Sequence, residues 1–222
     1  FSRLTSNMAS KVYEFVHTPE SLQHLGVVPW RGDEYATVMF CDLTASSNLF
    51  EELNVSMAVQ HINEYLEKVC DAAFFHGATV DKYIGDGVLL RFNVPRPIDG
   101  HPYEALKAAI EIQEAFEDLK KDWMTIDDKL SGLYTRAGMA YGPVQKANIG
   151  HPQYQYLTLF GRPVNAAVTL CEEAPRDKNI IIVDEMLYAE LKDRLEAVKI
   201  PDQQLGKAKK YTLSAYYVTR LK

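Results

Sequence analysis

The sequence predicts an α+β fold, in which an antiparallel-rich mixed sheet is covered by helices and preceded by an N-terminal stalk helix. From residue 35 onward, short apolar runs alternate with longer segments whose apolar residues recur every three or four positions. Gly85-Asp86-Gly87 separates two of the apolar runs and is typical of a tight hairpin, which joins antiparallel strands. A chain of 222 residues with 47% hydrophobic and 24% charged residues has enough apolar side chains for one core.

Residues 1–34 are predicted to form a helix and a connector. Their apolar residues are spaced by 3, 4, 4 and 3, as on one helix face: Phe1, Leu4, Met8, Val12 and Phe15. Thr18-Pro19 ends this helix. Two interpretations are open, an amphipathic helix folded back on its own domain or a dimerising stalk that transmits a signal from an upstream sensor. Because the chain begins with Phe1 rather than Met, we expect it to be a piece of a longer protein.

The first half of the following domain, residues 35–222, alternates strands and helices. Its predicted elements are strand 36–41, helix 56–73, strands 79–84 and 88–92, and helix 101–123. The first strand is a short apolar run, and the next two flank the hairpin turn. Both helices carry their apolar residues on one face, and the second repeats them at intervals of 4, 3, 4 and 3.

The second half contains more strands than helices. Its predicted elements are strands 134–140 and 144–149 around Tyr141-Gly142-Pro143, strand 154–160, helix 163–173, and strands 180–183 and 211–218. Gly and Pro in the 141–143 segment predict a break between two strands. Pro163 suits the first turn of the helix that follows, where its missing N–H has no partner to lose.

Composition excludes several classes of protein. A net charge of −6 and the absence of a basic stripe argue against a nucleic-acid partner. The three cysteines, scattered through apolar segments, are typical of reduced core residues and not of a disulfide or zinc framework. No apolar run reaches the length of a membrane span and no signal-peptide pattern is present, so a cytoplasmic location is expected.

Two aspartates are the strongest candidates for chemistry. Asp42 follows the apolar run Val38–Cys41, and Asp86 lies in the hairpin turn after Ile84. Carboxylates fixed at strand ends can bind two Mg²⁺ ions together with substrate phosphates, an arrangement that suits in-line displacement at phosphorus. The alternative is that each is an ordinary turn residue, since Asp is common in turns.

Four segments in order resemble the class III nucleotidyl cyclases, the catalytic domain of adenylyl and guanylyl cyclases. Met39–Ser47 (MFCDLTASS) is similar to the first metal-binding strand, with Ala45 where glycine is usual. Val80–Phe92 (VDKYIGDGVLLRF) is the most specific match. Arg136–Val144 with Ala147–Gly150 resembles the family's "GIGxxxGxVxxGNIG" hairpin, and Thr158–Asn165 resembles "TxxGxxVN". The resemblance covers residues 35–218 and implies the ferredoxin-like cyclase fold.

The resemblance also implies roles for individual residues. Asp42, Leu43 and Asp86 would bind two Mg²⁺ or Mn²⁺ ions from one subunit of a dimer. Substrate contacts would come from Lys82 and Thr158 at the base, from Lys210 at the γ-phosphate, and from Leu43, Thr44, Ala45, Ser46 and Ser47, whose N–H groups would cradle the triphosphate. Asn165 would be catalytic. The Lys82 ammonium can donate a hydrogen bond to adenine N1, whereas guanine has an N–H at that position, so ATP is the favoured substrate. The Thr158 hydroxyl can donate or accept, so it discriminates less between the two bases.

Each of these residues also has a plain structural interpretation. Lys82 could be a solvated strand charge, Thr158 a β-branched strand residue, Asn165 a polar residue of a first helical turn, and Lys210 part of a solvated loop. The family's arginine four residues after the asparagine is replaced by Thr169. Arg162 and Arg91 are the candidates to replace it, and Arg162 is taken as the catalytic one. Loss of such an arginine costs on the order of 10³–10⁵ in rate in related phosphoryl transfers.

The predicted function is conversion of ATP to 3′,5′-cyclic AMP and pyrophosphate by two Mg²⁺ or Mn²⁺ ions at a dimer interface. A homodimer is expected, a heterodimer stays open, and an upstream sensor domain or activator is expected to control activity. Two alternatives are kept. The domain could be a catalytically weak or pseudo-cyclase regulatory module, or a cyclase that makes cyclic GMP or a cyclic pyrimidine nucleotide.

Overall fold

The computed structural model describes residues 34–46, 49, 53–125, 127–151, 153–201, 204–211 and 214–222. The predicted N-terminal helix and most of its connector lie outside the described residues, and so does Ser47. Among the residues that are described, no helix has the length and apolar character needed to cross a membrane.

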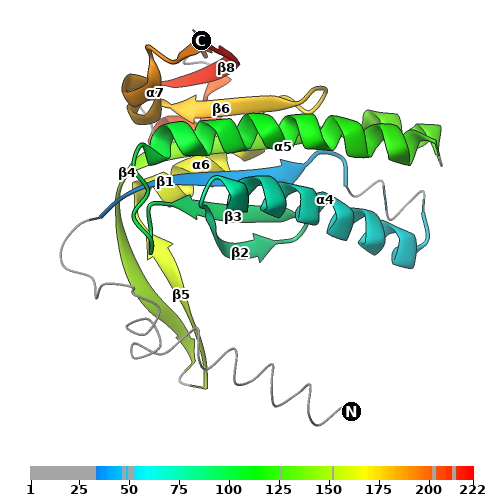
Figure 1. Cartoon of the computed structure of the whole chain (residues 1–222), viewed down its shortest axis with the longest axis horizontal. Coiled ribbons are helices and arrows are strands. Elements are labelled where there is room, and N and C mark those ends of the chain that lie inside the picture. Colours follow the sequence, from blue (N-terminus) through cyan, green and yellow to red (C-terminus); the bar gives the residue numbers. More distant parts are fainter. Residues whose placement is uncertain are drawn as a thin grey trace.

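An eight-stranded, mostly antiparallel sheet forms the centre of the molecule (Figure 1). Its strands are β1 Glu34–Leu43, β2 Thr79–Ile84, β3 Gly87–Phe92, β4 Thr135–His151, β5 Tyr154–Phe160, β6 Ile180–Asp184, β7 Leu195–Lys199 and β8 Ala215–Leu221. The order is β2-β3-β1-β4-β6-β8-β7, with β5 paired to β4 outside this path. Only β4 and β6 pair in parallel among the described strands. The α+β prediction is confirmed.

Helices cover both faces of the sheet. The helices are α4 Val55–Phe75, α5 His101–Met124, α6 Arg162–Glu172 and α7 Glu185–Leu191, with 3₁₀ turns η1 Asp128–Gly132 and η3 Gly206–Lys210. The long helices α4 and α5 lie side by side and bury one core with the sheet, while α6 packs on the opposite face of β1 and β4 (Figure 1). The predicted helices 56–73, 101–123 and 163–173 are found with ends that differ by at most two residues.

Strand β1 lies between β3 and β4 and is buried on both faces. Met39 and Cys41 join the core under α4 and α5, whereas Val38 and Phe40 join the core under α6. A continuous apolar run is what a strand covered on both faces requires. Because side chains alternate along a strand, Asp42 lies on the same face as Phe40, the face covered by α6.

Strand β4 is one unbroken strand, so the predicted break at residues 141–143 was wrong. Gly142 adopts a φ of +151°, a conformation that favours glycine, and the pairing of β4 with β1 continues through it. The first part of β4 pairs with β1 up to Val144, and residues 145–151 pair with β5. This second part and β5 form an arm that projects from the body of the domain (Figure 1). Gly-Pro therefore marks a change of partner strand and not a turn.

The C-terminal elements were only partly predicted. The last strand is Ala215–Leu221 and not 211–218, because the 3₁₀ turn η3 runs to Lys210 and Tyr211 follows it in a turn. Helix α7 and strand β7 were not predicted. Asp184 starts α7 as its N-cap and accepts a hydrogen bond from the Leu187 N–H at 2.9 Å, a standard local signal for a helix start.

The same aspartate is held by a basic side chain from α6. Asp184 is fully buried, and the Arg162 guanidinium donates to it at 2.7 Å. Burial raises the pKa of Asp184 to about 6, and the Leu187 N–H and Arg162 oppose this rise. The pKa of this buried carboxyl group is therefore set by two opposing effects, desolvation, which raises it, and hydrogen bonding, which lowers it.

Replacing Asp184 by asparagine should change how stability depends on pH. The folded pKa of about 6 lies above the ordinary value of 3.8, so stability from this group is complete below about pH 4 and is lost as pH rises through 6. Asparagine still accepts from Leu187 but does not ionise. We expect the free energy of unfolding of Asp184→Asn, relative to that of wild type, to rise by about 2 kcal/mol between pH 4 and pH 7. Urea denaturation measures this, and an equal difference at both pH values would contradict it.

Candidate active site

Asp42 and Asp86 lie at the same end of the sheet. Asp42 is the last residue but one of β1, and Asp86 is the second residue of the two-residue turn between β2 and β3. Cys41 is opposite Val88 in the register of β1 and β3, so the turn lies beside the end of β1. Gly87 allows this approach, because a Cβ at that position would lie 2.5 Å from the Phe40 ring. The turn is therefore pressed against the strand that carries Asp42.

Electrostatics shows that these carboxylates influence each other. Burial, followed by the charge of Asp86, raises the pKa of Asp42, while Arg136 and Arg176 lower it. The Oδ2 atom of Asp86 is buried and has no hydrogen-bond partner among the described residues. Two neighbouring carboxylates with one unsatisfied buried oxygen fit a hard divalent cation, which prefers oxygen ligands and takes others from phosphate and water.

Arg136 holds the Asp42 side chain in place. It lies opposite Asp42 in the register of β1 and β4, and its guanidinium forms a short ion pair with the Asp42 carboxylate. Its other terminal nitrogen donates to the backbone carbonyls of Glu172 and Ala174, at 3.3 and 3.4 Å, at the end of α6. Arg136 was not predicted as a site residue. In the sequence, the role of Arg136 is indicated only by the presence of a basic residue in an otherwise apolar strand.

Lys82 and Thr158 are brought together by a third residue, Asp81. Thr158 on β5 donates its hydroxyl hydrogen to the Asp81 carboxylate at 2.6 Å, and the Lys82 ammonium lies 3.4 Å from the same oxygen. Lys82 also lies over the ring of Tyr156, 5.1 Å from its centroid. Thr158 is only 1% exposed, so in this conformation its hydroxyl faces Asp81 and not solvent. Asp81 was missed as a site residue, since sequence alone does not place β5 beside β2.

The predicted residues of α6 occupy different environments. Asn165 is exposed and close to the start of the helix. Thr169 is buried, and its hydroxyl donates to the Asn165 carbonyl oxygen at 2.8 Å, a bond within one helical turn. Arg162, the candidate to replace the missing arginine, is paired with Asp184. Arg91, the other candidate, is buried beside Asp81 with 3.2 Å between the charged atoms.

The segment after Asp42 is a turn. The Thr44 N–H was predicted to bind the triphosphate. In the structure it donates instead to the Tyr134 carbonyl oxygen at 2.7 Å, so it is not available to a phosphate. Ala45 has a φ of +55°, a conformation that favours glycine, which is the residue usual here in the family it resembles. Roles for Leu43, Ala45 and Ser46 in binding metal or phosphate stay predictions.

The predicted phosphate residue Lys210 lies in the basic turn η3. Glu173, directly after α6, accepts hydrogen bonds from the backbone N–H groups of Lys207 and Ala208 at the start of this turn. The exposed Lys210 ammonium lies 5.3 Å from the centroid of the Tyr211 ring. Because Arg136 binds the same end of α6, the turn and the Asp42 side chain are anchored to one helix end.

Comparisons with known proteins agree on one family. The sequence profile of the adenylate and guanylate cyclase catalytic domain matches residues 28–218. A protein named adenylate cyclase from Anabaena cylindrica is 28% identical over 133 residues, 59% of this chain and 26% of that protein. An uncharacterized protein of Mycobacterium tuberculosis, Rv1319c, is 28% identical over 142 residues, 64% of this chain and 25% of that protein. The chain thus spans about a quarter of the length of these curated relatives.

Solved structures show the same fold. The adenylyl cyclase CyaB from P. aeruginosa superposes with a TM-score of 0.71 at 23% identity, covering 85% of this chain and 95% of that one. The guanylyl cyclase Cya2 gives a TM-score of 0.73 at 21% identity, covering 86% and 94%. A bacterial light-regulated adenylyl cyclase gives 0.75 at 22% identity, covering 97% and 62%. With its carboxylate pair, its fold and the family profile, the chain belongs to the class III nucleotidyl cyclases, as a catalytic domain of that family.

Proposed function

We propose that this cyclase domain converts ATP to 3′,5′-cyclic AMP and pyrophosphate with two divalent metal ions, at sites shared between two chains. The observation that carries the proposal is the convergence of Asp42 and Asp86 at one end of the sheet, where a buried oxygen of Asp86 has no hydrogen-bond partner within the described part of the chain. A domain used only for packing gains nothing from two carboxylates that repel each other.

Different residues of the chain would bind the metal ions, the base and the phosphates. Asp42 and Asp86 would hold the metal ions, and Arg136 orients Asp42 by its ion pair. When bound there, Mg²⁺ or Mn²⁺ supplies charge neutralisation at the triphosphate and lowers the pKa of the attacking hydroxyl. The ribose 3′-hydroxyl oxygen forms a bond to the α-phosphorus, the bond to the pyrophosphate breaks, and Asp42 is the candidate acceptor of the hydroxyl proton. Lys82 would bind the base, and Asn165 would face the ribose and phosphates from the partner chain.

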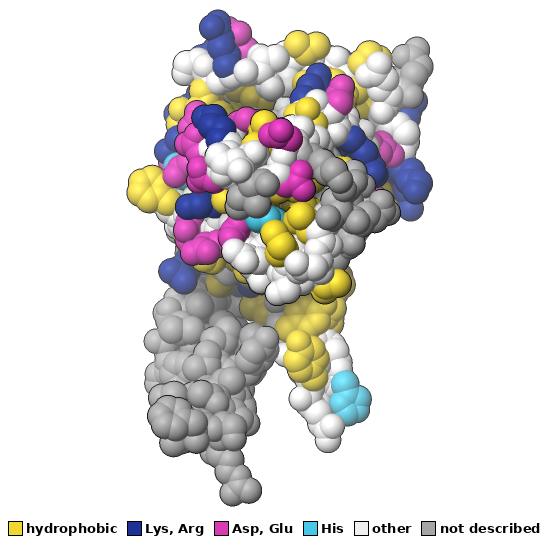
Figure 2. Space-filling view, turned by 90° about the vertical axis from the view of Figure 1, so that its right-hand side faces the viewer, with side chains coloured by type: hydrophobic (Ala, Val, Ile, Leu, Met, Phe, Trp, Pro, Cys, Tyr) yellow, Lys and Arg dark blue, Asp and Glu magenta, His cyan; other side chains and the backbone are white. Residues whose placement is uncertain are grey.

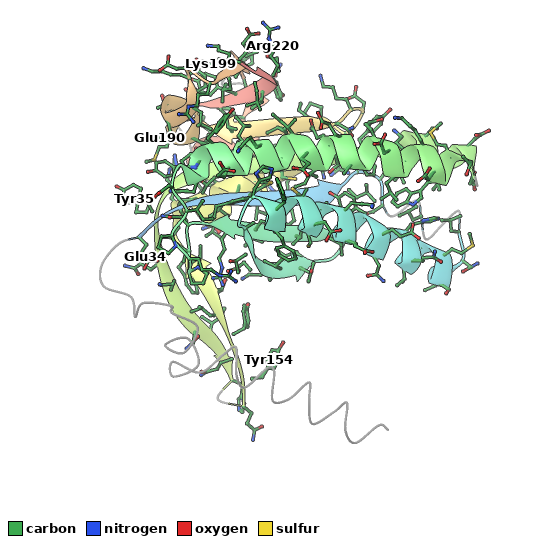
Figure 3. The ribbon with its side chains drawn as sticks, in the orientation of Figure 1. Glu34, Tyr35, Tyr154, Glu190, Lys199 and Arg220 are labelled. Atoms are coloured by element: carbon green, nitrogen blue, oxygen red, sulfur yellow. The ribbon has the colours of Figure 1, made fainter. Side chains whose placement is uncertain are left out.

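The arm formed by β4 and β5 supports a dimer. Hydrophobic side chains gather along it (Figure 2), and Tyr154 and Phe160 are 65% and 45% exposed. Tyr154 lies toward the tip of the arm (Figure 3). Exposed apolar surface of this kind is typical of a protein interface. A homodimer is the simplest partner arrangement, and a heterodimer with a related chain would use the same arm.

Control by a further segment is also part of the proposal. The curated relatives are about four times longer than the region they share with this chain, which leaves room in them for regulatory domains. For this chain we infer an upstream sensor or activator that acts through residues 1–34.

A second candidate function is a weak or regulatory pseudo-cyclase, and two observations favour it. Thr169 stands where the family has an arginine, and its side chain is buried and bonded within its own helix. The substitute Arg162 is engaged by Asp184. Without a guanidinium at the phosphates, turnover would be slower by about 10³-fold or more. The intact carboxylate pair favours slow catalysis over none.

Product analysis tests the choice of base. We expect the purified chain with Mn²⁺ to make mainly cyclic AMP when offered ATP, GTP, CTP and UTP separately, because Lys82 donates to the adenine N1 acceptor. Lys82→Glu, which accepts instead of donating, should lower the preference for ATP over GTP by tenfold or more. Chromatography of the products measures both. A cyclic GMP or cyclic pyrimidine product from wild type would show that the base assignment is wrong, and no product from any nucleotide would favour the pseudo-cyclase.

Mixing two inactive chains tests the shared site. Asp86→Ala removes a metal ligand and Lys82→Ala removes the base contact, so each variant alone should be inactive. In an equal mixture half of the dimers are mixed and have one intact site of two, so about a quarter of wild-type activity should return. Recovered activity is measured as cyclic nucleotide formed per chain, with chain exchange confirmed by differently tagged subunits. Mixed dimers without activity would place the metal and base contacts of one site on a single chain.

A further inference from the structure

The geometry assigns Asp81 as a positioning residue that sets the base preference of the site through Lys82 and Thr158. This inference rests on the proposed function, and it concerns a residue that the sequence analysis did not assign to the site. Asp81 lies at an irregularity in strand β2. The register between β2 and β3 shifts between Val80 and Lys82, so that Asp81 has no partner residue on β3. Such a bulge changes the direction of a side chain.

The Asp81 side chain lies where β2 and β5 meet, and it is 1% exposed. One carboxylate oxygen accepts from the Thr158 hydroxyl at 2.6 Å and lies 3.4 Å from the Lys82 ammonium. The other oxygen faces the Arg91 guanidinium at 3.2 Å. The Arg91 side chain is itself only 7% exposed, so its guanidinium is a buried countercharge for Asp81. Asp81 thus contacts both residues predicted to bind the base.

These contacts fix which hydrogen bonds remain for a ligand. The Thr158 hydroxyl hydrogen is committed to Asp81, so toward any other group its oxygen acts only as an acceptor. The Lys82 side chain is 29% exposed, and its ammonium, which lies near Asp81 and the Tyr156 ring, acts only as a donor. With Asp81 in place, the pair therefore offers one donor and one acceptor in a fixed order.

With the Lys82 ammonium at the ring nitrogen and the Thr158 oxygen at the neighbouring exocyclic group, as the proposed function has them, one class of nucleobase matches this order. Adenine and cytosine each present a ring nitrogen that accepts and an amino group that donates, whereas guanine and uracil present an oxygen that accepts and a ring N–H that donates. The site should therefore favour bases with an amino group on this edge. Thr158 is buried in the single chain, so contact with its oxygen requires a shift of the residues around it. The Lys82 contact needs no such shift.

A double-mutant cycle tests whether Asp81 acts through Lys82. Asp81→Asn keeps the shape and loses the charge, and we expect it to lower the preference for 3′-deoxy-ATP over 3′-deoxy-GTP by about tenfold or more, as for loss of one charged hydrogen bond. Calorimetric binding with Mn²⁺ measures this without turnover. In the Lys82→Ala background, Asp81→Asn should lower the preference by a smaller factor, because only the contact of Asp81 with Thr158 remains. An unchanged preference in the single variant, or an equal further loss in the double variant, would overturn the inference.

A second pair of variants covers the case in which Asp81→Asn does not fold. Thr158→Ser keeps the hydroxyl and should keep the preference, whereas Thr158→Val should lower it. Asp118→Asn, on the exposed face of α5, is the matched control and should behave as wild type. A preference that Thr158→Val leaves unchanged would overturn the inference. Wild type that binds nucleotides with the expected preference but forms no cyclic product refutes the proposed cyclisation alone, and wild type that binds no nucleotide refutes both.

Discussion

The arrangement of the site depends on the ion pair between Arg136 and Asp42. Two carboxylates at one end of a buried sheet repel each other and lose hydration, and both effects raise the pKa of Asp42. Arg136 opposes them from the neighbouring strand, where the register of β1 and β4 places it opposite Asp42. Since Arg136 also donates to two backbone carbonyls at the end of α6, one side chain joins the strand that carries Asp42, its neighbour and the helix that carries Asn165. A metal ion would take over part of the charge balance that Arg136 now provides.

A second polar cluster joins the arm to the body of the domain. Asp81, Thr158 and Lys82 link β2 with β5, and the arm is one of the parts of the domain that expose large apolar side chains. The residues proposed to bind the base are therefore linked to the element proposed to form the dimer. Under the proposed function, dimer formation and nucleotide choice would be coupled, since movement of β5 would move Thr158 and disturb its hydrogen bond to Asp81.

Local patterns predicted much of this structure and of the site. Asp42 follows a buried run and Asp86 lies in a Gly-flanked turn, and both signals lie within a few neighbouring residues. Asp81 and Arg136 were missed because their importance depends on which strands are neighbours. A bulge in β2 and the pairing of β1 with β4 do not show in hydrophobic periodicity. The break predicted at 141–143 was wrong for a related reason. Gly142 and Pro143 indicate a turn locally, but the strand continues there because it has partners on both sides of that point.

Counting bound metal ions tests the central claim, that Asp42 and Asp86 form one two-metal site. Titration of Mn²⁺ into the chain with saturating 3′-deoxy-ATP, followed by electron paramagnetic resonance, reports the number of ions and any coupling between neighbouring ones. We expect two coupled Mn²⁺ ions per nucleotide in wild type. Asp86→Asn, which leaves the ion pair of Asp42 with Arg136 in place, should lose the coupled signal. Two coupled ions that persist in Asp86→Asn, or wild type that binds nucleotide without them, would contradict the account.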